Sequence, residues 1–303
     1  LNCKLSLSSL YLGGCKKILQ ITFVASILSI SICFSTYLLN NKGAVSVSTP
    51  FRHYIETHQV FTTAGALNAC GGGASIRTAL SRAVADGHIA KVRNGLYVSH
   101  TGRFIDLKVD PYRVAATFDP AAIFSFHSAL ELHGLAHSVS NRVQFRAQAA
   151  RLSFTFDDSF FTRYPMQESV LSDAIQANSF GTVSVTTREQ TFLDCMNHLR
   201  LCGGAEEVLH SLAGLPYLHL DVVVDLLDNY PASVVARAGW YLEANAQRWN
   251  VSATLLDGLE KRLARNASYY LDSTARKGAQ AFSTRWKLNL PATTAEIASW
   301  MEL

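Results

Sequence analysis

At 303 residues, the chain is long enough for a small module and a larger domain with its own hydrophobic core. Hydrophobic residues make up 49% of it and charged residues 17%, a composition that excludes general disorder. The net charge of +4 is unevenly distributed, because residues 51–103 carry +4 whereas residues 104–303 carry −4. A basic segment beside a mildly acidic body is the charge pattern expected of a nucleic-acid-binding module.

Residues 1–44 form an apolar leader that does not suit such a module. Residues 18–39 are apolar enough, and about long enough, to span a bilayer. The first methionine is Met166, whereas Val45 or Val47 could correspond to a GUG start codon in a raw translation. We therefore expect residues 1–44 to be translated upstream sequence. The alternative is a genuine membrane anchor, which would place the rest of the chain outside the cell.

Residues 50–103 have the order helix, glycine turn, second helix and two-stranded hairpin, which is typical of the winged helix-turn-helix. Thr62 or Thr63 can cap the first helix, and the glycines at 71–73 allow a turn at positive φ. Ser75 can cap the second helix. Apolar residues recur in that helix at helical spacing, at Ile76, Leu80 and Val84.

The remaining face of the second helix carries side chains suited to DNA. They are of the types that contact phosphates and base edges: Arg77, Thr78, Ser81 and Arg82. The short strands 89–92 and 96–98 flank Arg93-Asn94-Gly95, a good tight-turn sequence. The hairpin is therefore expected to present a cationic wing tip.

Residues 110–291 predict a larger, helix-rich domain of mixed α and β structure, followed by a tail at 292–303 with a short helix capped by Thr294. Alternating apolar and polar residues predict strands at 141–147, 152–156, 183–186 and 283–290. Helices are expected from Pro111, over 122–134, and at 188–199, 206–212, 221–227, 233–246 and 252–265. The expected fold class is therefore α+β, with an N-terminal winged helix-turn-helix before this larger domain.

Catalytic, metal and cofactor sites are not expected. His133 and His137 have the i, i+4 spacing of a metal site, but the sequence HGLAH lacks the glutamate of HExxH, and Gly134 should end the helix between them. Neither a G-x-S-x-G nucleophile elbow nor a P-loop lysine is present. Three cysteines follow the leader without metal-ligand spacing, and they are expected to be buried, reduced thiols of a cytoplasmic protein: Cys70, Cys195 and Cys202.

A second basic cluster lies late in the chain. It contains Lys261, Arg262 and Arg265, with Arg276 and Lys277 further on. Two interpretations remain open. The cluster is either a solvated helix face or a second surface that contacts the DNA backbone without contributing to sequence choice.

Several stretches, in order and over about residues 55–291, resemble the AbiEi antitoxin family of type IV toxin–antitoxin and phage abortive-infection systems. They are VFTTAGAL, GHIAKVRNGLYV, DPYRVAATFDPAAIFSFHSALELHGLAHSVSNRV, VTTREQTFLDC, GGAEEVLHSL and RWKLNLP. The resemblance implies an N-terminal winged helix-turn-helix and a larger C-terminal antitoxin domain. A membrane-spanning N-terminus is not part of the family pattern.

The resemblance also implies how such a protein acts. It would repress its own operon by binding inverted repeats in promoter DNA. It would counteract a co-encoded nucleotidyltransferase-like toxin, without a stable complex and without a small-molecule substrate. The DNA-binding positions implied are Ser75, Arg77, Thr78, Ser81 and Arg82 on the recognition helix and Lys91, Arg93 and Asn94 on the wing. The alternative is a membrane-tethered or orphan transcriptional regulator or adaptor without a toxin partner.

Overall fold

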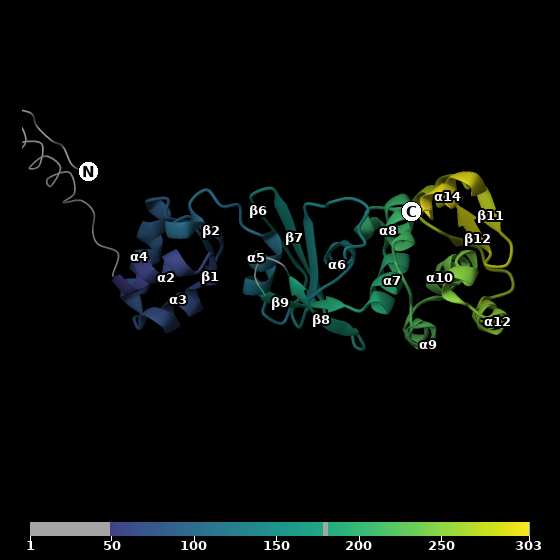
Figure 1. Ribbon diagram of the computed structural model, residues 1–303, viewed down its shortest axis with the longest axis horizontal. Coiled ribbons are helices and arrows are strands. Elements are labelled where there is room, and N and C mark those ends of the chain that lie inside the picture. Colours follow the sequence, from purple (N-terminus) through teal and green to yellow (C-terminus); the bar gives the residue numbers. More distant parts are fainter. Residues whose placement is uncertain (1–48, 178–180, 303) are drawn as a thin grey trace, which may run out of the picture. The chain divides into compact units, whose positions relative to one another are not determined.

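A computed structural model describes residues 49–177 and 181–302 of the protein (Figure 1). Helices and strands are mixed, as the sequence predicts. The apolar leader at residues 1–44 lies outside the described residues. Within the described ranges, no helix combines the length and apolar character needed to cross a membrane. The chain divides into the units Leu1–Arg52 and His53–Leu303, and the following concerns the second unit except where α2 (Thr49–Thr57) crosses the boundary.

The N-terminal module, residues 53–103 with the preceding turn of α2, combines short helices with a three-stranded antiparallel sheet. After α2 come β1 (Val60–Thr62), α3 (Thr63–Cys70), α4 (Ala74–Ala85), β2 (Ile89–Arg93) and β3 (Leu96–Ser99). The strand order is β1-β3-β2. The predicted hairpin is therefore confirmed, and β1 pairs with it as a strand that the sequence pattern did not reveal.

The connection between α3 and α4 depends on Thr62 and the glycine turn. Thr62 Oγ1 accepts a hydrogen bond from the Gly65 amide at 3.0 Å, so the predicted cap of α3 is confirmed. Gly71 ends α3 at φ +69°, in the left-handed region that favours glycine. The predicted cap of α4 by Ser75 is wrong. The N-cap is Gly73, so α4 begins before Ser75, which lies in its first turn.

A six-stranded mixed sheet follows, in the order β6-β7-β5-β4-β9-β8. Its strands are β4 (Ile123–Phe124), β5 (Arg142–Ala147), β6 (Leu152–Phe156), β7 (Ser159–Pro165), β8 (Ser172–Ala177) and β9 (Gly181–Thr186). The pairs β5–β7 and β4–β9 are parallel, and the other neighbours are antiparallel. Two helices, α5 (Pro111–Phe118) and α6 (His127–Leu132), come from the chain before and after β4.

Residues 122–134 do not form the single helix that was expected, because they form strand β4 and then helix α6. Ile123 and Phe124 pair with both β5 and β9, which places them inside the sheet. Phe126 adopts φ +61° and ψ −136°, so a helix can begin only at His127. The prediction of one helix is therefore wrong, because strand partners distant in sequence outweigh a local pattern with helical character. The strands β7 and β8 were also not predicted.

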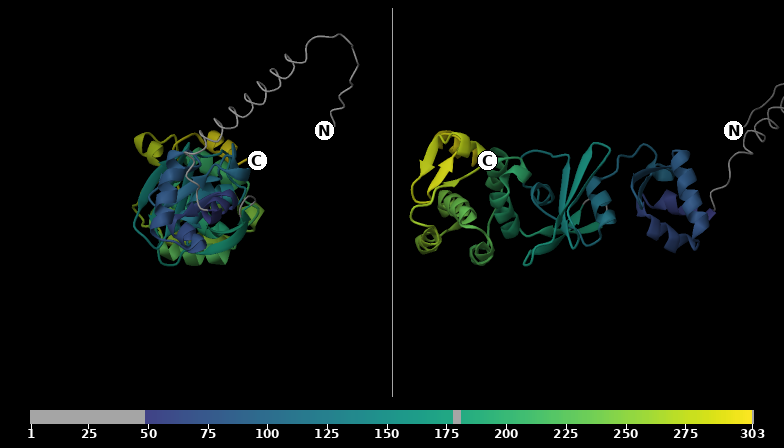
Figure 2. Two further views of the ribbon diagram at one scale, coloured as in Figure 1. Left: turned by 90° about the vertical axis from the view of Figure 1, so that its left-hand side faces the viewer. Right: turned by 180° about the vertical axis from the view of Figure 1, so that it is seen from behind.

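The C-terminal half is mainly helical. Its helices are α7 (Arg188–Asn197), α8 (Ala205–Ala213), α9 (Leu220–Leu226), α10 (Ala232–Ala244), α11 (Ala246–Trp249), α12 (Ala253–Lys261), α13 (Ser273–Lys277) and α14 (Thr294–Trp300). A small sheet packs against α10, with the order β10-β12-β11, formed by β10 (Tyr269–Tyr270), β11 (Ala281–Ser283) and β12 (Leu288–Leu290) (Figure 2). The strand expected over 283–290 is thus two antiparallel strands joined by a turn.

Two hydrophobic clusters form the core. One joins the helices α7, α8, α10 and α12 with the small sheet. The other contains Val92 and Val98 of the N-terminal module together with Val114, Phe124 and Phe145 from α5 and the six-stranded sheet. The apolar side of the module's hairpin is therefore buried in a core shared with the six-stranded sheet.

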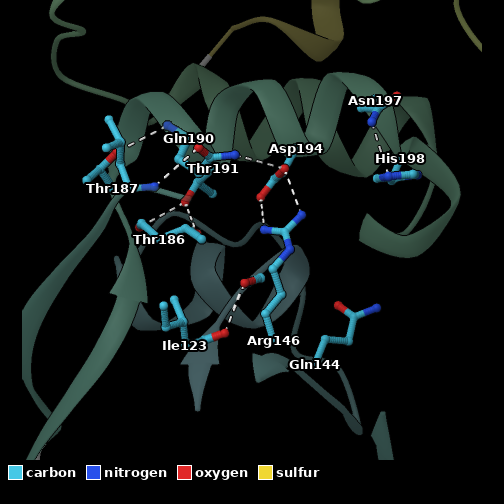
Figure 3. A network of polar contacts seen from close by, with 12 residues as sticks. Ile123, Gln144, Arg146, Thr186, Thr187, Gln190, Thr191, Asp194, Asn197 and His198 are labelled. Atoms are coloured by element: carbon cyan, nitrogen blue, oxygen red, sulfur yellow. Dashed lines mark hydrogen bonds and ion pairs between the residues drawn. The ribbon is translucent and has the colours of Figure 1, made fainter. Parts of the chain in front are cut away.

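A buried ion pair joins that sheet to α7 (Figure 3). Arg146 of β5 and Asp194 of α7 have side chains that are 2% and 1% exposed, and two guanidinium nitrogens donate to the two carboxylate oxygens. Asp194 Oδ1 also accepts from the Gln190 amide at 3.2 Å and the Tyr230 hydroxyl at 2.9 Å. The guanidinium in turn lies 4.5 Å from the centre of the Phe126 ring. Such complete pairing is what a charge needs to remain buried.

Replacing one residue of this ion pair should lower the free energy of unfolding substantially. Asp194→Asn keeps the side-chain shape but leaves the Arg146 charge buried without its counter-charge, and we expect a loss of about 3–5 kcal/mol in the free energy of unfolding. The double variant Arg146→Met, Asp194→Leu should lose less, because both charges are removed. As a control, Asp228→Asn breaks the exposed pair with Arg262 and should cost less than about 1 kcal/mol. Urea unfolding measures all three; equal losses for Asp194→Asn and Asp228→Asn would contradict this assignment.

Candidate nucleic-acid interface

Helix α4 separates an apolar face from a polar one. Ile76, Leu80 and Ala83 are buried against the rest of the module. The polar residues predicted from the sequence all lie on the surface, at Ser75, Arg77, Thr78, Ser81 and Arg82. This division follows from the helical period, since residues three and four apart share one side of the helix.

The two arginines of α4 are not engaged by any acidic side chain that the structure describes. Within the described residues, neither Arg77 nor Arg82 takes part in a salt bridge. The hydroxyls of Thr78 and Ser81 each donate to the carbonyl four residues earlier, at 3.1 Å. Both side chains are exposed, and their oxygens can still accept a hydrogen bond. The surface of α4 thus presents two guanidinium groups without a described acidic partner and two hydroxyls, which suits phosphates and base edges.

The hairpin tip differs from the sequence expectation at one position. Lys91 and Asn94 are exposed. Arg93 is not presented in the same way, because its guanidinium lies 4.5 Å from the centre of the Phe118 ring and 5.2 Å from that of Phe154. Its Nε and Nη1 atoms are buried without a hydrogen-bond partner.

The sequence predicted Arg93 as an exposed side chain at a cationic wing tip, whereas the structure shows it half-buried. Two ring faces stabilise the charge of this half-buried side chain, and the burial of Nε and Nη1 leaves less of its N–H edge for DNA than at the exposed Lys91 and Asn94. The rings belong to Phe118 of α5 and Phe154 of β6, far along the chain, so no local pattern could reveal the contact. We leave Arg93 out of the candidate interface and keep Lys91 and Asn94.

The second basic cluster does not form one continuous face. Helix α12 ends at Lys261, and Arg262 pairs with Asp228 at 2.9 Å. Arg265 lies in the exposed segment beyond the helix. Nearby, Asp257 and Glu260 bind Arg285. This mixture of charges favours a solvated surface over a second phosphate-contacting one.

The histidines considered as metal ligands have other partners. His133 Nε2 bonds to the Thr186 carbonyl at 2.7 Å, and the ring of His137 stacks on that of His210 with centres 4.4 Å apart. No group of three or more histidine, cysteine or acidic side chains is arranged to hold a metal ion within the described ranges. His133 and His137 thus do not face a common point.

His127 instead forms a buried cluster with two glutamates. Its Nδ1 lies 3.2 Å from Glu131 Oε1, an ion-pair distance without hydrogen-bond geometry, and its Nε2 lies 3.2 Å from Glu207 Oε1. Burial by itself lowers the pKa of His127, but the contacts and charges of both glutamates together raise it above its ordinary value of 6.5. Although burial acts to raise them, the pKa values of Glu131 and Glu207 are lowered by their hydrogen bonds and by His127.

This cluster predicts a specific pH dependence of stability. The pKa of His127 is raised in the folded state. Its contribution to the free energy of unfolding is therefore complete below the ordinary pKa of 6.5 and is lost as the pH rises through the folded-state pKa. The stability lost in His127→Gln should therefore be larger at about pH 5.5 than at about pH 8.5 in thermal unfolding. His133→Gln is the control with the opposite trend, because burial lowers the pKa of His133. Parallel trends for the two variants would contradict the assignment.

Comparisons with known proteins bear on the fold. No family model matches the sequence, and no curated protein matches it. Among solved structures, the chain is similar to the RV2827C protein from Mycobacterium tuberculosis, with a TM-score of 0.59 and 15% sequence identity over 84% of this chain and 92% of that one. At this identity, the similarity concerns the arrangement of helices and strands and nothing further.

Proposed function

We propose that residues 50–103 form a winged helix-turn-helix that binds duplex DNA, with α4 as the recognition helix. The observation that carries this proposal is the pair of exposed arginines Arg77 and Arg82, which have no salt-bridge partner among residues 49–177 and 181–302 and lie outside the buried face of α4. Such guanidinium groups bind phosphates or the guanine edge. The excess of basic residues in 51–103, against an acidic remainder, supports the same assignment.

The geometry of α4 is compatible with a major groove. Its 12 residues correspond to a length of about 18 Å, and an α-helix fits a groove about 12 Å wide. The hairpin β2–β3 follows α4 after a short turn, in the position of a wing. On this proposal, Lys91 and Asn94 of the hairpin contact the flanking backbone, while Ser75, Thr78 and Ser81 contribute hydroxyls from α4.

The wider role proposed is that of an antitoxin that represses its own operon. The support is the series of stretches that resembles the AbiEi family over about residues 55–291. On this proposal the module binds inverted repeats in the promoter. The larger domain, residues 110–291, counteracts a co-encoded nucleotidyltransferase-like toxin in the cytoplasm without forming a stable complex. No catalytic residue, metal or cofactor is assigned to the chain.

The DNA-binding proposal predicts the effect of Arg77→Ala. Loss of one phosphate or guanine contact should weaken binding to the DNA upstream of the gene by about 1–3 kcal/mol, and Arg82→Ala should behave similarly. Fluorescence anisotropy at several salt concentrations measures both the affinity and its salt slope. The control is Arg262→Ala with Arg265→Ala, outside the module. Unchanged binding by Arg77→Ala and Arg82→Ala, or an equal loss in the control, would refute the role of α4.

The antitoxin role predicts a result in cells that does not depend on DNA binding by α4. Expression of the neighbouring nucleotidyltransferase-like reading frame alone should arrest growth, and co-expression of this chain should restore it. The double variant Arg77→Ala, Arg82→Ala should still restore growth from a heterologous promoter, because neutralisation is assigned to residues 110–291. The absence of such a neighbouring frame, or growth arrest that this chain does not relieve, would leave a DNA-binding regulator without a toxin partner.

A further inference from the structure

Three open hollows adjoin one another beside the six-stranded sheet and the C-terminal half. Their volumes are about 930, 720 and 370 Å³, and Arg200 and Leu201 line all three. Arg151 and Tyr164 line the first two, and Arg142 lines the last two. Because they share these lining residues, the three hollows lie next to one another and are described together as one depression.

Exposed arginines follow this depression along its length. We call it the arginine groove, defined by Arg142, Arg151, Arg200 and Arg276. In the described part of the chain, none of the four takes part in a salt bridge. Among the described residues that line the groove, Asp272 is the single acidic one, and its carboxylate accepts a hydrogen bond from the Ala275 amide at 2.9 Å.

The floor of the largest hollow adds further positive charge. Arg146 is neutralised by its pairing with Asp194, but Arg237 is bound by neutral groups. It donates to the carbonyls of Tyr270 at 2.9 Å and Met196 at 2.7 Å. Burial lowers the pKa of Arg237, and the charge of the Asp272 carboxylate acts in the opposite direction.

Aromatic rings accompany three of the four exposed arginines. The distances from the guanidinium carbon to the ring centre are 5.8 Å for Arg142 and Phe160, 5.2 Å for Arg151 and Tyr164, and 5.3 Å for Arg276 and Tyr270. Phe160 is 47% exposed. A guanidinium that lies on a ring still has its N–H edge available for an anion.

This accumulation of charge is not a property of the surrounding chain. Residues 104–303 carry a net charge of −4, so the groove is locally basic within a part of the sequence that is acidic overall. Four like charges that no described carboxylate pairs with create a local positive potential in a concave surface, which attracts an extended anion. Arginines spread over three adjoining hollows suit a ligand with several successive negative charges better than one compact phosphate.

We propose that the arginine groove binds single-stranded nucleic acid. Successive backbone phosphates contact Arg142, Arg151, Arg200 and Arg276, while an unpaired base stacks on the exposed ring of Phe160. A positively charged groove with aromatic rings is the arrangement by which proteins bind single strands with little sequence preference. This surface is separate from α4, and the proposal does not depend on duplex binding or on the antitoxin role.

The test uses the full chain and fluorescein-labelled U12 and dT12 oligonucleotides in anisotropy titrations. The wild-type protein should bind at least one of them at low salt, with an affinity that falls as salt rises. Binding of U12 alone would identify RNA as the strand, and binding of dT12 alone would identify DNA. The variant Arg151→Ala, Arg200→Ala should weaken binding at least tenfold. The matched control Arg262→Ala, Arg265→Ala removes two basic side chains outside the groove and should bind like the wild type.

Further arms separate this proposal from its alternatives. The groove variant should keep the wild-type melting temperature and duplex affinity, whereas Arg77→Ala, Arg82→Ala should lose duplex binding and keep single-strand binding. Failure of wild-type protein to bind U12 and dT12 would overturn the proposal and leave duplex binding untouched. An equal loss of single-strand binding in the control variant would also overturn the proposal. Competition by uridine monophosphate as effective as that by U12 would also overturn it, in favour of a mononucleotide site.

Discussion

The buried ion pair between Arg146 and Asp194 is the constraint on which the arrangement of the larger domain depends. It joins the central strand β5 to α7, and α7 leads directly into the 3₁₀ turn Leu199–Cys202 that carries Arg200. Removing two charges from water is expensive, and their attraction offsets that expense only when the geometry and the remaining hydrogen bonds are complete. Gln190 and Tyr230 supply those bonds from α7 and from the chain beyond α9. The pair thus links β5 directly to α7, and the chain after α7 carries Arg200 of the arginine groove.

The role of each arginine discussed above depends on the side chains that contact it. Arg146 is paired and buried and therefore holds the fold together. Arg93 lies against two aromatic rings and is half-buried, whereas its position in the sequence predicted an exposed side chain. Arg77 and Arg82 have no acidic partner in the described residues and remain available for an external anion. The same side chain thus supports a core or presents a binding surface, depending on neighbours that come from distant parts of the chain.

The sequence predicted best where structure depends on neighbours along the chain. The Thr62 cap and the hairpin β2–β3 follow from side chains within a few residues, and the structure confirms them. It predicted less well where a strand depends on distant partners. Residues 122–134 have helical character, yet β4 pairs with β5 and β9 inside the sheet. Nor did the sequence reveal the arginine groove, since its residues are dispersed between positions 142 and 276.

By itself the sequence determined the mixed α+β class, the alternation of exposed and buried faces along α4 and the basic character of residues 51–103. Each of these follows from composition or from the period of a single element. Only the tertiary structure decided which charges are neutralised, where the module's hairpin finds its core and how three hollows meet at Arg200. The physical reason is that desolvation and pairing depend on groups brought together through space, and the spacing of residues along a chain does not specify which groups those are.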